Sequence, residues 1–220
     1  PNGCGKSTLL RIINGIVKPD AGSLDIGQTI RMGYFSQENE YMNDSMRVID
    51  YVKEVGEYIT TSDGKITASQ MLENFLFDGA IQWSKIENLS GGEKRRLYLL
   101  RILMGAPNVL ILDEPTNDLD IQTLTILEDY LDRFDGIIIV VSHDRYFLDR
   151  TVNRIFSFEG DGVIRQFEGD YSDYLIRKEL EALPEEMDAP GARKESRDDR
   201  TPNVEERPAE NSKDTWKKRD

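Results

Sequence analysis

Two segments of the sequence contain residue types that could bind and cleave a chain of phosphates. The first is PNGCGKST at residues 1–8, in which Gly5, Lys6 and Ser7 match the end of the phosphate-binding loop pattern G-x-x-x-x-G-K-[ST]. Glycines let backbone N–H groups approach phosphate oxygens, and a following helix offers further N–H groups. Lys6 would reach the β- and γ-phosphates, Ser7 would bind Mg²⁺, and Thr8 would lie near the α-phosphate. The loop alone leaves open a glycine turn before an ordinary helix.

The second segment is VLILDEP at residues 109–115, a short apolar run that ends in two acids. Such a run is typical of a buried parallel strand, and α/β folds bind ligands at the carboxyl ends of their strands. Asp113 would hold Mg²⁺ through water, and Glu114 would polarise the attacking water. Two acids can also end a strand and simply face solvent. Because a phosphate loop precedes them in the expected chain order, we favour hydrolysis of a nucleotide.

The elements that must position these residues follow from hydrophobic patterning and turn residues. The predicted fold class is α/β, a mainly parallel sheet flanked by helices. We expect a loop and helix at 3–16, with Leu9, Leu10, Ile12, Ile13 and Ile16 as its apolar face; strands at 23–27 and 30–37; buried strands within 108–115 and 136–144; a loop and then a helix within 88–107, with a stop at 106–107; a helix at 121–134; a hairpin at 154–159 and 163–169; and a helix at 172–183. Residues 44–88 read as mostly helical, with a break at 60–65.

Composition restricts the partners. The formal net charge of −13 argues against general affinity for a nucleic-acid backbone. Cys4 is the single cysteine, so no internal disulfide can form. No run approaches the ~20 apolar residues of a membrane-spanning helix. The basic string EKRR at 93–96 could bind nucleic acid, but we favour the charged first turns of a helix. The inward-facing residues of that helix would be Leu97, Leu99, Leu100 and Leu103.

The last part of the chain has a different composition. Residues 184–220 carry many charges of both signs and scattered prolines, with Met187, Val204 and Trp216 as the only sizeable apolar residues. Such a segment cannot bury enough apolar surface to offset the entropy lost on ordering. We therefore predict a domain at 1–183, with a helical subdomain at about 44–88, and a disordered tail or linker at 184–220.

The segment NLSGGEKRR at 88–96 resembles the signature motif of ATP-binding cassette ATPases, and other motifs extend the resemblance over nearly all of residues 1–183. PNGCGKST resembles the Walker A loop without its first glycine, and LILDEP resembles Walker B followed by the catalytic glutamate. The resemblance implies a P-loop NTPase fold of the cassette type, ATP hydrolysis, and ATP and Mg²⁺ as cofactors. The ATP-binding residues that it implies are Asn2, Gly3, Cys4, Gly5, Lys6, Ser7, Thr8 and Gln37.

The same resemblance implies roles for residues elsewhere in the chain. Glu114 and His143, the latter in VVSHD, would be catalytic, and Asp120 in NDLD matches the D-loop. The residues around Mg²⁺ would be Ser7, Gln37 and, through water, Asp113. In this superfamily two cassettes face each other head to tail, so the signature segment would contact ATP held by the partner cassette. The signature residues are Ser90, Gly91, Gly92 and Glu93.

Three longer strings of residues indicate one particular group of ATP-binding cassette ATPases. DEPTNDLD, SHDRYFLDR and FEGDYSDYL resemble the ABC-F proteins, tandem-cassette ATPases without a membrane domain, many of which act on ribosomes. The resemblance implies a second cassette normally in the same full-length chain, the ribosome as partner, no direct DNA binding and a cytoplasmic location. We expect the chain to be the second of two cassettes, with a start inside Walker A that omits a strand pair and the adenine-stacking aromatic residue. Such a half should bind ATP weakly and hydrolyse it poorly alone.

Other functions stay open at this point. The chain could be the ATPase subunit of a membrane transporter, which would need a partner with transmembrane helices. It could also be a non-hydrolysing interaction fragment, if the shortened loop fails to close on nucleotide. A DNA-associated cassette ATPase is disfavoured, because such proteins carry very long coiled coils and no heptads occur here.

Overall fold

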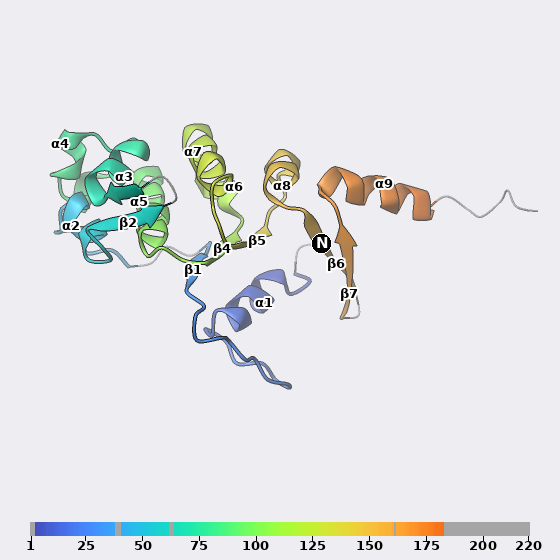
Figure 1. The fold of residues 1–220 in the computed structure, drawn as a ribbon. Coiled ribbons are helices and arrows are strands. Elements are labelled where there is room, and N and C mark those ends of the chain that lie inside the picture. Colours follow the sequence, from blue (N-terminus) through green and yellow to red (C-terminus); the bar gives the residue numbers. More distant parts are fainter. Residues whose placement is uncertain (1–2, 38–40, 62–63, 161, 183–220) are drawn as a thin grey trace, which may run out of the picture. The chain divides into compact units, whose positions relative to one another are not determined.

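The computed structural model describes residues 3–37, 41–61, 64–160 and 162–182, and Figure 1 shows their helices and strands in chain order. All of them belong to one unit of the chain, residues 1–183. The segment 184–220, predicted to be a tail, lies outside the described residues, and the boundary at 183 stays a prediction. Asn2 and Pro1 lie outside them as well.

A parallel sheet of three strands forms the centre of this unit, in the order β1-β4-β5. The strands are β1 (Met32–Phe35), β4 (Val109–Asp113) and β5 (Ile137–Val141). Every residue of β4 is buried, and Ile111 pairs with Tyr34 on one side and with Ile139 on the other. Because neighbouring side chains of a strand point to opposite faces, β4 contributes to two apolar clusters. Leu110 and Leu112 join the larger cluster, and Val109 and Ile111 join the smaller one.

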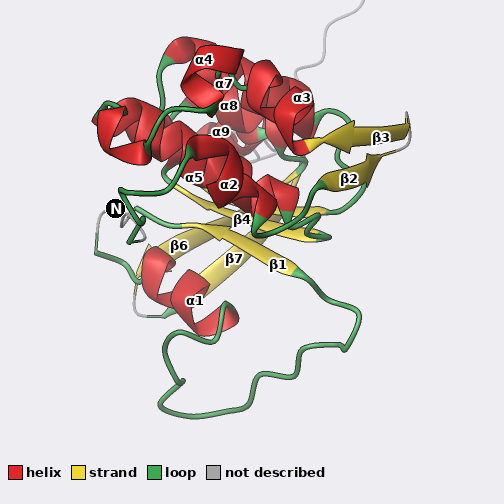
Figure 2. Ribbon diagram, turned by 90° about the vertical axis from the view of Figure 1, so that its left-hand side faces the viewer, coloured by secondary structure: helices red, strands yellow, loops and turns green. Residues whose placement is uncertain are grey.

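Helices cover both faces of this sheet (Figure 2). Helix α1 (Lys6–Ile13) lies on one face, where Leu10 packs with Val109 and Ile111. Helices α5 (Gly91–Met104) and α7 (Ile121–Leu131) lie on the other, and their leucines join Leu110 and Leu112 in the larger cluster. The fold class is therefore the predicted one, a parallel sheet with helices on both faces. The apolar face predicted for α1 is only partly right, because the helix ends at Ile13 and leaves Leu9 and Ile16 exposed.

Two strand predictions need correction. Residues 23–27 form no strand, and their Leu24 and Ile26 are exposed, because no described strand lies beside them to complete a ladder of hydrogen bonds. The strand predicted within 136–144 does form, as β5, but it is not fully buried. It lies at the edge of the three-stranded sheet, and Ile137 at its start is 59% exposed.

Residues 44–88 contain more than the predicted helices. Helix α2 (Val48–Lys53) is followed by an antiparallel pair, β2 (Tyr58–Thr61) and β3 (Gly64–Thr67), then by α3 (Ala68–Asn74), α4 (Gly79–Gln82) and the 3₁₀ helix η1 (Ile86–Asn88). The predicted break at 60–65 is thus part of a hairpin, in which Ile59 pairs with Ile66. Tyr, Ile and Thr favour strands, so the local composition explains the pair. The status of 44–88 as a subdomain stays a prediction.

The elements after β4 largely match the patterning. They are α6 (Pro115–Asp118), α7, α8 (Arg145–Thr151), β6 (Arg154–Gly160), β7 (Val163–Glu168) and α9 (Tyr171–Ala182). The predicted hairpin is confirmed, with β6 and β7 antiparallel, and so is the last helix. The short helices α6 and α8 were not predicted, since each is too brief to show a period.

The basic string at 93–96 lies in the first turns of α5, as predicted. Leu97, Leu99, Leu100 and Leu103 are buried as expected, but Arg95 and Arg96 are buried too. Each arginine stacks on an aromatic ring and pairs with an aspartate, Asp118 for Arg95 and Asp120 for Arg96. These pairs offset the desolvation of the charges. Of the helices that the structure describes, none combines the length and the apolarity needed to cross a membrane.

Candidate nucleotide-binding site

A cavity of about 430 Å³ lies where β4 and β5 end and α1 begins. It brings together most of the residues predicted to bind or cleave a nucleotide, from segments that are far apart in the chain. The lining residues are Gly3, Gly5, Lys6, Ser7, Thr8, Gln37, Glu114, Asn117, Val141 and His143. This position at the carboxyl ends of parallel strands is where α/β folds bind ligands.

The glycine loop enters the cavity in a conformation that only glycine adopts easily. Gly3 has φ +78° and Gly5 has φ +93°, both in the left-handed region. No neighbouring atom lies within 4 Å of a Cβ built at either position, so the backbone conformation, and not lack of space, calls for glycine. Gly5 is the N-cap of α1, and the first N–H groups of that helix open toward the loop. Lys6 Nζ lies 3.6 Å from the sulfur of Cys4, which is partly buried beside it.

Ser7 and Asp113, both predicted to lie near Mg²⁺, meet directly. The Ser7 hydroxyl donates to Oδ1 of Asp113 at 3.3 Å, and the Tyr34 hydroxyl donates to Oδ2 at 3.4 Å. Asp113 is buried at the end of β4. Burial, and next the negative charge of Asp113, raise the pKa of Tyr34, so this hydroxyl stays a donor at neutral pH. The two contacts fix both oxygens of the carboxylate.

Glu114 occupies a strained and buried position. Its φ is +52° and its ψ is +53°, left-handed values that a residue other than glycine rarely adopts. The turn from β4 into α6 at this residue carries the carboxylate into the wall of the cavity. Oε1 lies 3.3 Å from Nε2 of His143, and Oε2 is buried with no hydrogen-bond partner among the described residues. A buried carboxylate oxygen without a donor is costly, which indicates a place for a bound water or ligand group.

His143 reaches the cavity from the loop after β5. The Ser142 hydroxyl accepts a hydrogen bond from the Asp144 N–H at 3.0 Å and lies 3.2 Å from the Thr116 hydroxyl. Asp144 in turn caps α8 by accepting from the Phe147 N–H at 3.1 Å. These contacts hold the loop on both sides of His143 and tie it to α6. The histidine side chain itself is largely exposed to the cavity.

Two amide side chains also line the cavity, one predicted as a site residue and one not. Gln37, predicted to bind ATP and Mg²⁺, lines the cavity from the segment after β1. Asn117 also lines it, from α6, although it was not predicted as a site residue. One feature of the sequence could have indicated it: Asn117 follows Glu114 by three residues, and residues three apart lie on the same side of a helix.

The signature residues lie outside this cavity. Ser90 is the N-cap of α5 and forms a capping box with Glu93. Its hydroxyl donates to Oε2 of Glu93 at 2.7 Å, and its backbone N–H donates to the same oxygen at 2.8 Å. These bonds, the one from the hydroxyl first, hold the pKa of Glu93 below its usual range. Gly91 and Gly92 are exposed at the helix N-terminus.

Asp120, predicted to be part of the D-loop, does not line the cavity either. It caps α7, where it accepts from the Thr123 N–H at 2.8 Å and from the Thr123 hydroxyl at 3.0 Å. The bond from the backbone of Thr123 is the main cause that lowers the pKa of this carboxyl. Arg96 lies 3.5 Å away.

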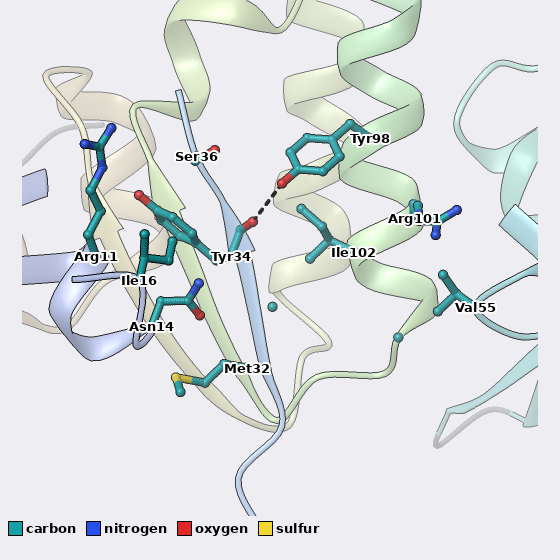
Figure 3. A pocket seen from close by; sticks show the side chains of 12 residues that line it. Arg11, Asn14, Ile16, Met32, Tyr34, Ser36, Val55, Tyr98, Arg101 and Ile102 are labelled. Carbon is teal, nitrogen blue, oxygen red and sulfur yellow. Dashed lines mark hydrogen bonds between the residues drawn. The ribbon is translucent and has the colours of Figure 1, made fainter. Parts of the chain in front are cut away.

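A second hollow, of about 580 Å³, follows the edge of β1 that no described strand pairs with (Figure 3). Its walls include Arg11 and Asn14 near α1, Tyr34 on β1, and Tyr98 and Ile102 on α5. None of the predicted site residues lines it. Despite its larger volume, it offers no glycine loop and no acidic group for phosphate chemistry, so we place the nucleotide site in the smaller cavity.

The residues of the smaller cavity suit a nucleoside triphosphate with Mg²⁺. The glycine loop and α1 supply N–H donors, and Lys6 supplies a positive charge. Ser7 and Asp113 place hydroxyl and carboxylate oxygens side by side, and oxygen ligands are those that Mg²⁺ prefers. The described residues contain no cluster of three or more acidic, histidine or cysteine side chains that could hold a metal alone.

Comparison with known proteins gives a consistent result. The family model described as ABC transporter matches residues 1–117. The ABC transporter ATP-binding protein YfmR of Bacillus subtilis, which is uncharacterized, is 60% identical over 176 residues, covering 80% of this chain and 28% of YfmR. The energy-dependent translational throttle protein EttA of Haemophilus influenzae is 40% identical over 173 residues, covering 79% of this chain and 31% of EttA. The chain spans less than a third of the length of these two relatives.

A solved structure supports the fold. The ATP-binding cassette MJ0796, determined as a dimer in a post-hydrolysis state with ADP and Pi bound, superimposes with a TM-score of 0.57 at 22% identity, covering 76% of this chain and 82% of that one. At this identity the likeness concerns the fold alone. With the family model matching more than half of the residues, the chain belongs to the ABC transporter family, as an ATP-binding cassette with the P-loop fold.

Proposed function

We propose that this chain is the cassette of an ABC-F type protein that hydrolyses ATP together with a second cassette and acts on the ribosome in the cytoplasm. The observation that carries the hydrolytic part is the position of Glu114. Its Oε1 faces His143 at 3.3 Å, and its buried Oε2 has no partner among the described residues. Both side chains line the cavity into which the glycine loop opens.

The residues of the cavity take complementary roles in the reaction, in which water attacks the γ-phosphate and ADP and phosphate are released. Lys6 and the loop N–H groups bind the phosphates, with Thr8 near the α-phosphate. Glu114 orients the attacking water and accepts its proton, and His143 contacts the γ-phosphate. Mg²⁺, when bound, neutralises phosphate charge; the residues around it are Ser7, Gln37 and, through water, Asp113. Positioning and electrostatics carry nearly all of such a reaction.

The signature segment supports the need for a second cassette. Ser90, Gly91 and Gly92 are too remote from the cavity to line it, yet they present the N-terminus of a 14-residue helix to solvent. Such a terminus favours an anion. We infer that it contacts the γ-phosphate of ATP on the partner cassette, so that ATP binding closes the pair and hydrolysis opens it. This chain alone should then bind ATP weakly and turn it over poorly.

The role on the ribosome rests on the relatives and on the strings DEPTNDLD, SHDRYFLDR and FEGDYSDYL. EttA, 40% identical over the matched region, is named for a function in translation. We infer from the length of the relatives that the cassette works within a longer tandem-cassette protein. The alternative is the ATPase subunit of a membrane transporter, which would sediment with membranes because it binds a membrane-spanning partner.

A sedimentation experiment tests this proposal. In the complete gene product that contains this chain, Glu114→Gln is introduced together with its counterpart in the other cassette, and lysates are run through sucrose gradients with ATP. Without the carboxylates the closed, ATP-bound pair should persist, so we expect the variant to move with ribosomes while the wild type mostly does not. Sedimentation with membranes would support the transporter subunit instead. A variant that stays at the top of the gradient would contradict the ribosomal role.

A further inference from the structure

Arg95 is a buried charge on α5, the helix that begins at the signature segment. It lies on the second turn of α5, and its side chain is only 4% exposed. The guanidinium stacks 4.0 Å from the centre of the Phe35 ring and 5.8 Å from that of Tyr98. A leucine would bury this helix face at far less cost in desolvation, so the charge calls for a reason beyond packing.

The polar contacts of Arg95 supply that reason. Nη2 donates to the backbone carbonyl of Ser36 and pairs with Oδ2 of Asp118 at 3.2 Å. Ser36 directly precedes Gln37, and Asp118 directly follows Asn117. Gln37 and Asn117 both line the nucleotide cavity. One guanidinium on the signature helix therefore joins the two segments that deliver these amides to the site.

A second contact reinforces the link between α5 and β1. The Tyr98 hydroxyl donates to the backbone carbonyl of Tyr34 at 3.4 Å, which Figure 3 shows as a dashed line. Tyr34 lies on β1, and Ser36 directly follows the strand. Side chains of α5 thus contact two backbone carbonyls of the segment that leads to Gln37.

We propose that Arg95 is a positioning residue that fixes Gln37 and Asn117 relative to the signature helix. This inference deepens the proposed ATPase function and rests on it. Arg95 then fixes the position of this cavity relative to the signature segment at the start of α5. The nucleotide in the cavity and the segment that contacts the partner's nucleotide thus keep a constant arrangement within one cassette. Arginine suits the task because its planar fork can stack on Phe35 and still donate in two directions, which a lysine ammonium cannot do in the same geometry.

A purely structural role for Arg95 is the competing explanation, and the same helix offers a matched control. Arg101 stacks 4.1 Å from the ring centre of Tyr51, donates to the Tyr51 carbonyl at 2.6 Å and pairs with Glu54 at 3.0 Å. Its contacts have the same chemistry as those of Arg95, but they lead to α2 and not to the nucleotide cavity. Arg95→Lys and Arg101→Lys therefore remove similar contacts, with different expected consequences.

The first experiment compares these variants in the complete gene product. We measure kcat for ATP, the Mg²⁺ concentration that gives half-maximal activity, equilibrium binding of a fluorescent ATP analogue, and Tm. Misplacing Gln37 should lower kcat by about 10- to 100-fold and raise the Mg²⁺ requirement. Nucleotide affinity should change little, because the glycine loop and Lys6 are untouched. Arg101→Lys should keep wild-type kcat within about twofold, since no contact of Arg101 reaches the cavity.

A combined variant separates positioning from general destabilisation. If Arg95 acts through Gln37 and Asn117, then Arg95→Lys should have little further effect on kcat in a background that carries both Gln37→Ala and Asn117→Ala. Asp118→Asn, which removes the partly exposed partner of Arg95, should reproduce the lower kcat and serves as the test if Arg95→Lys does not fold.

Additive losses in the combined variant, or equal behaviour of Arg95→Lys and Arg101→Lys in an active protein, would overturn the inference and leave the ATPase function standing. If the wild type does not hydrolyse ATP, the proposed function fails, and this inference fails with it.

Discussion

Oε1 of Glu114 lies 3.3 Å from Nε2 of His143, although the two residues follow different strands and their side chains differ sharply in exposure, 7% for the glutamate and 61% for the histidine. The buried member is held by a left-handed backbone at the end of β4, and the exposed member by a loop tied to Ser142 and Asp144. This pairing places a fixed carboxylate beside an imidazole that can reach a ligand in the cavity.

Replacing His143 with alanine should impair the chemical step more than nucleotide binding. The imidazole can contact the γ-phosphate and restrain Glu114, but the phosphate loop is unchanged in this variant. We expect kcat to fall about 10- to 1,000-fold, as when one stabilising donor is removed from an active site, with nearly unchanged affinity for a fluorescent ATP analogue. Steady-state kinetics and equilibrium titration measure the two effects. Equal losses in kcat and in affinity would contradict this role for His143.

Replacing Lys6 with alanine should mainly weaken the binding of nucleotide. Lys6 is the single basic side chain among the described residues that line the cavity, so Lys6→Ala removes the positive charge nearest to the expected phosphates. The loss of one charge-assisted hydrogen bond should weaken nucleotide binding by about 10- to 100-fold. Lys18→Ala, an exposed lysine in the turn after α1, is the control and should bind like the wild type. Isothermal titration of both variants checks this, and equal affinities would rule out the placement of phosphate at the loop.

Gly5→Ala tests the shape of the loop. At φ +93° an alanine is strained by about 1–2 kcal/mol even though its Cβ would meet no neighbour. The loop should therefore relax to another conformation and bind nucleotide more weakly, while Tm changes little because the loop is outside the core. Gly79→Ala, at the start of α4 and without a positive φ, should leave binding intact. Unchanged nucleotide binding by Gly5→Ala would show that the observed loop conformation is not the binding one.

The cap of α7 gives a prediction on stability and its dependence on pH. Asp120→Ala removes the acceptor for Thr123 and should lower the free energy of unfolding by about 1 kcal/mol at pH 7. The folded-state pKa of Asp120 is lowered, so its contribution is present above the unfolded-state pKa and is lost as pH falls through the folded-state pKa. The difference between wild type and variant should thus shrink below about pH 4. Urea unfolding at several pH values measures it, and a constant difference would exclude the charged cap.

Much of the fold and the site could be predicted because the signals are local in the chain. Gly5, Lys6 and Ser7 adjoin the helix that they begin, and Asp113 and Glu114 adjoin the buried strand that carries them. Parallel strands then bring their carboxyl ends to one edge, so Gln37 and His143 reach the same cavity without any long-range signal in the sequence. The positions of these site residues were predictable because the parallel sheet brings the residues that follow its strands to one edge.

The features that were missed depend on tertiary partners. The burial of Arg95 and Arg96 was not predicted, because it depends on the aromatic rings and aspartates around them. The strand expected at 23–27 requires a neighbour, and none of the described strands lies beside it. The hairpin of β2 and β3 was hidden because each strand has only four residues, too few to show a period.

The most direct test of the account concerns Glu114. Under single-turnover conditions, the complete gene product binds radiolabelled ATP, and both bound nucleotide and released phosphate are followed in the wild type and in Glu114→Gln. Glu128→Gln, at a partly buried acid that is paired with Arg150 away from the cavity, is the control. We predict that Glu114→Gln binds ATP as tightly as the wild type but cleaves it about 100- to 1,000-fold more slowly. Cleavage at the wild-type rate by this variant would contradict the assignment of Glu114 as the group that activates water.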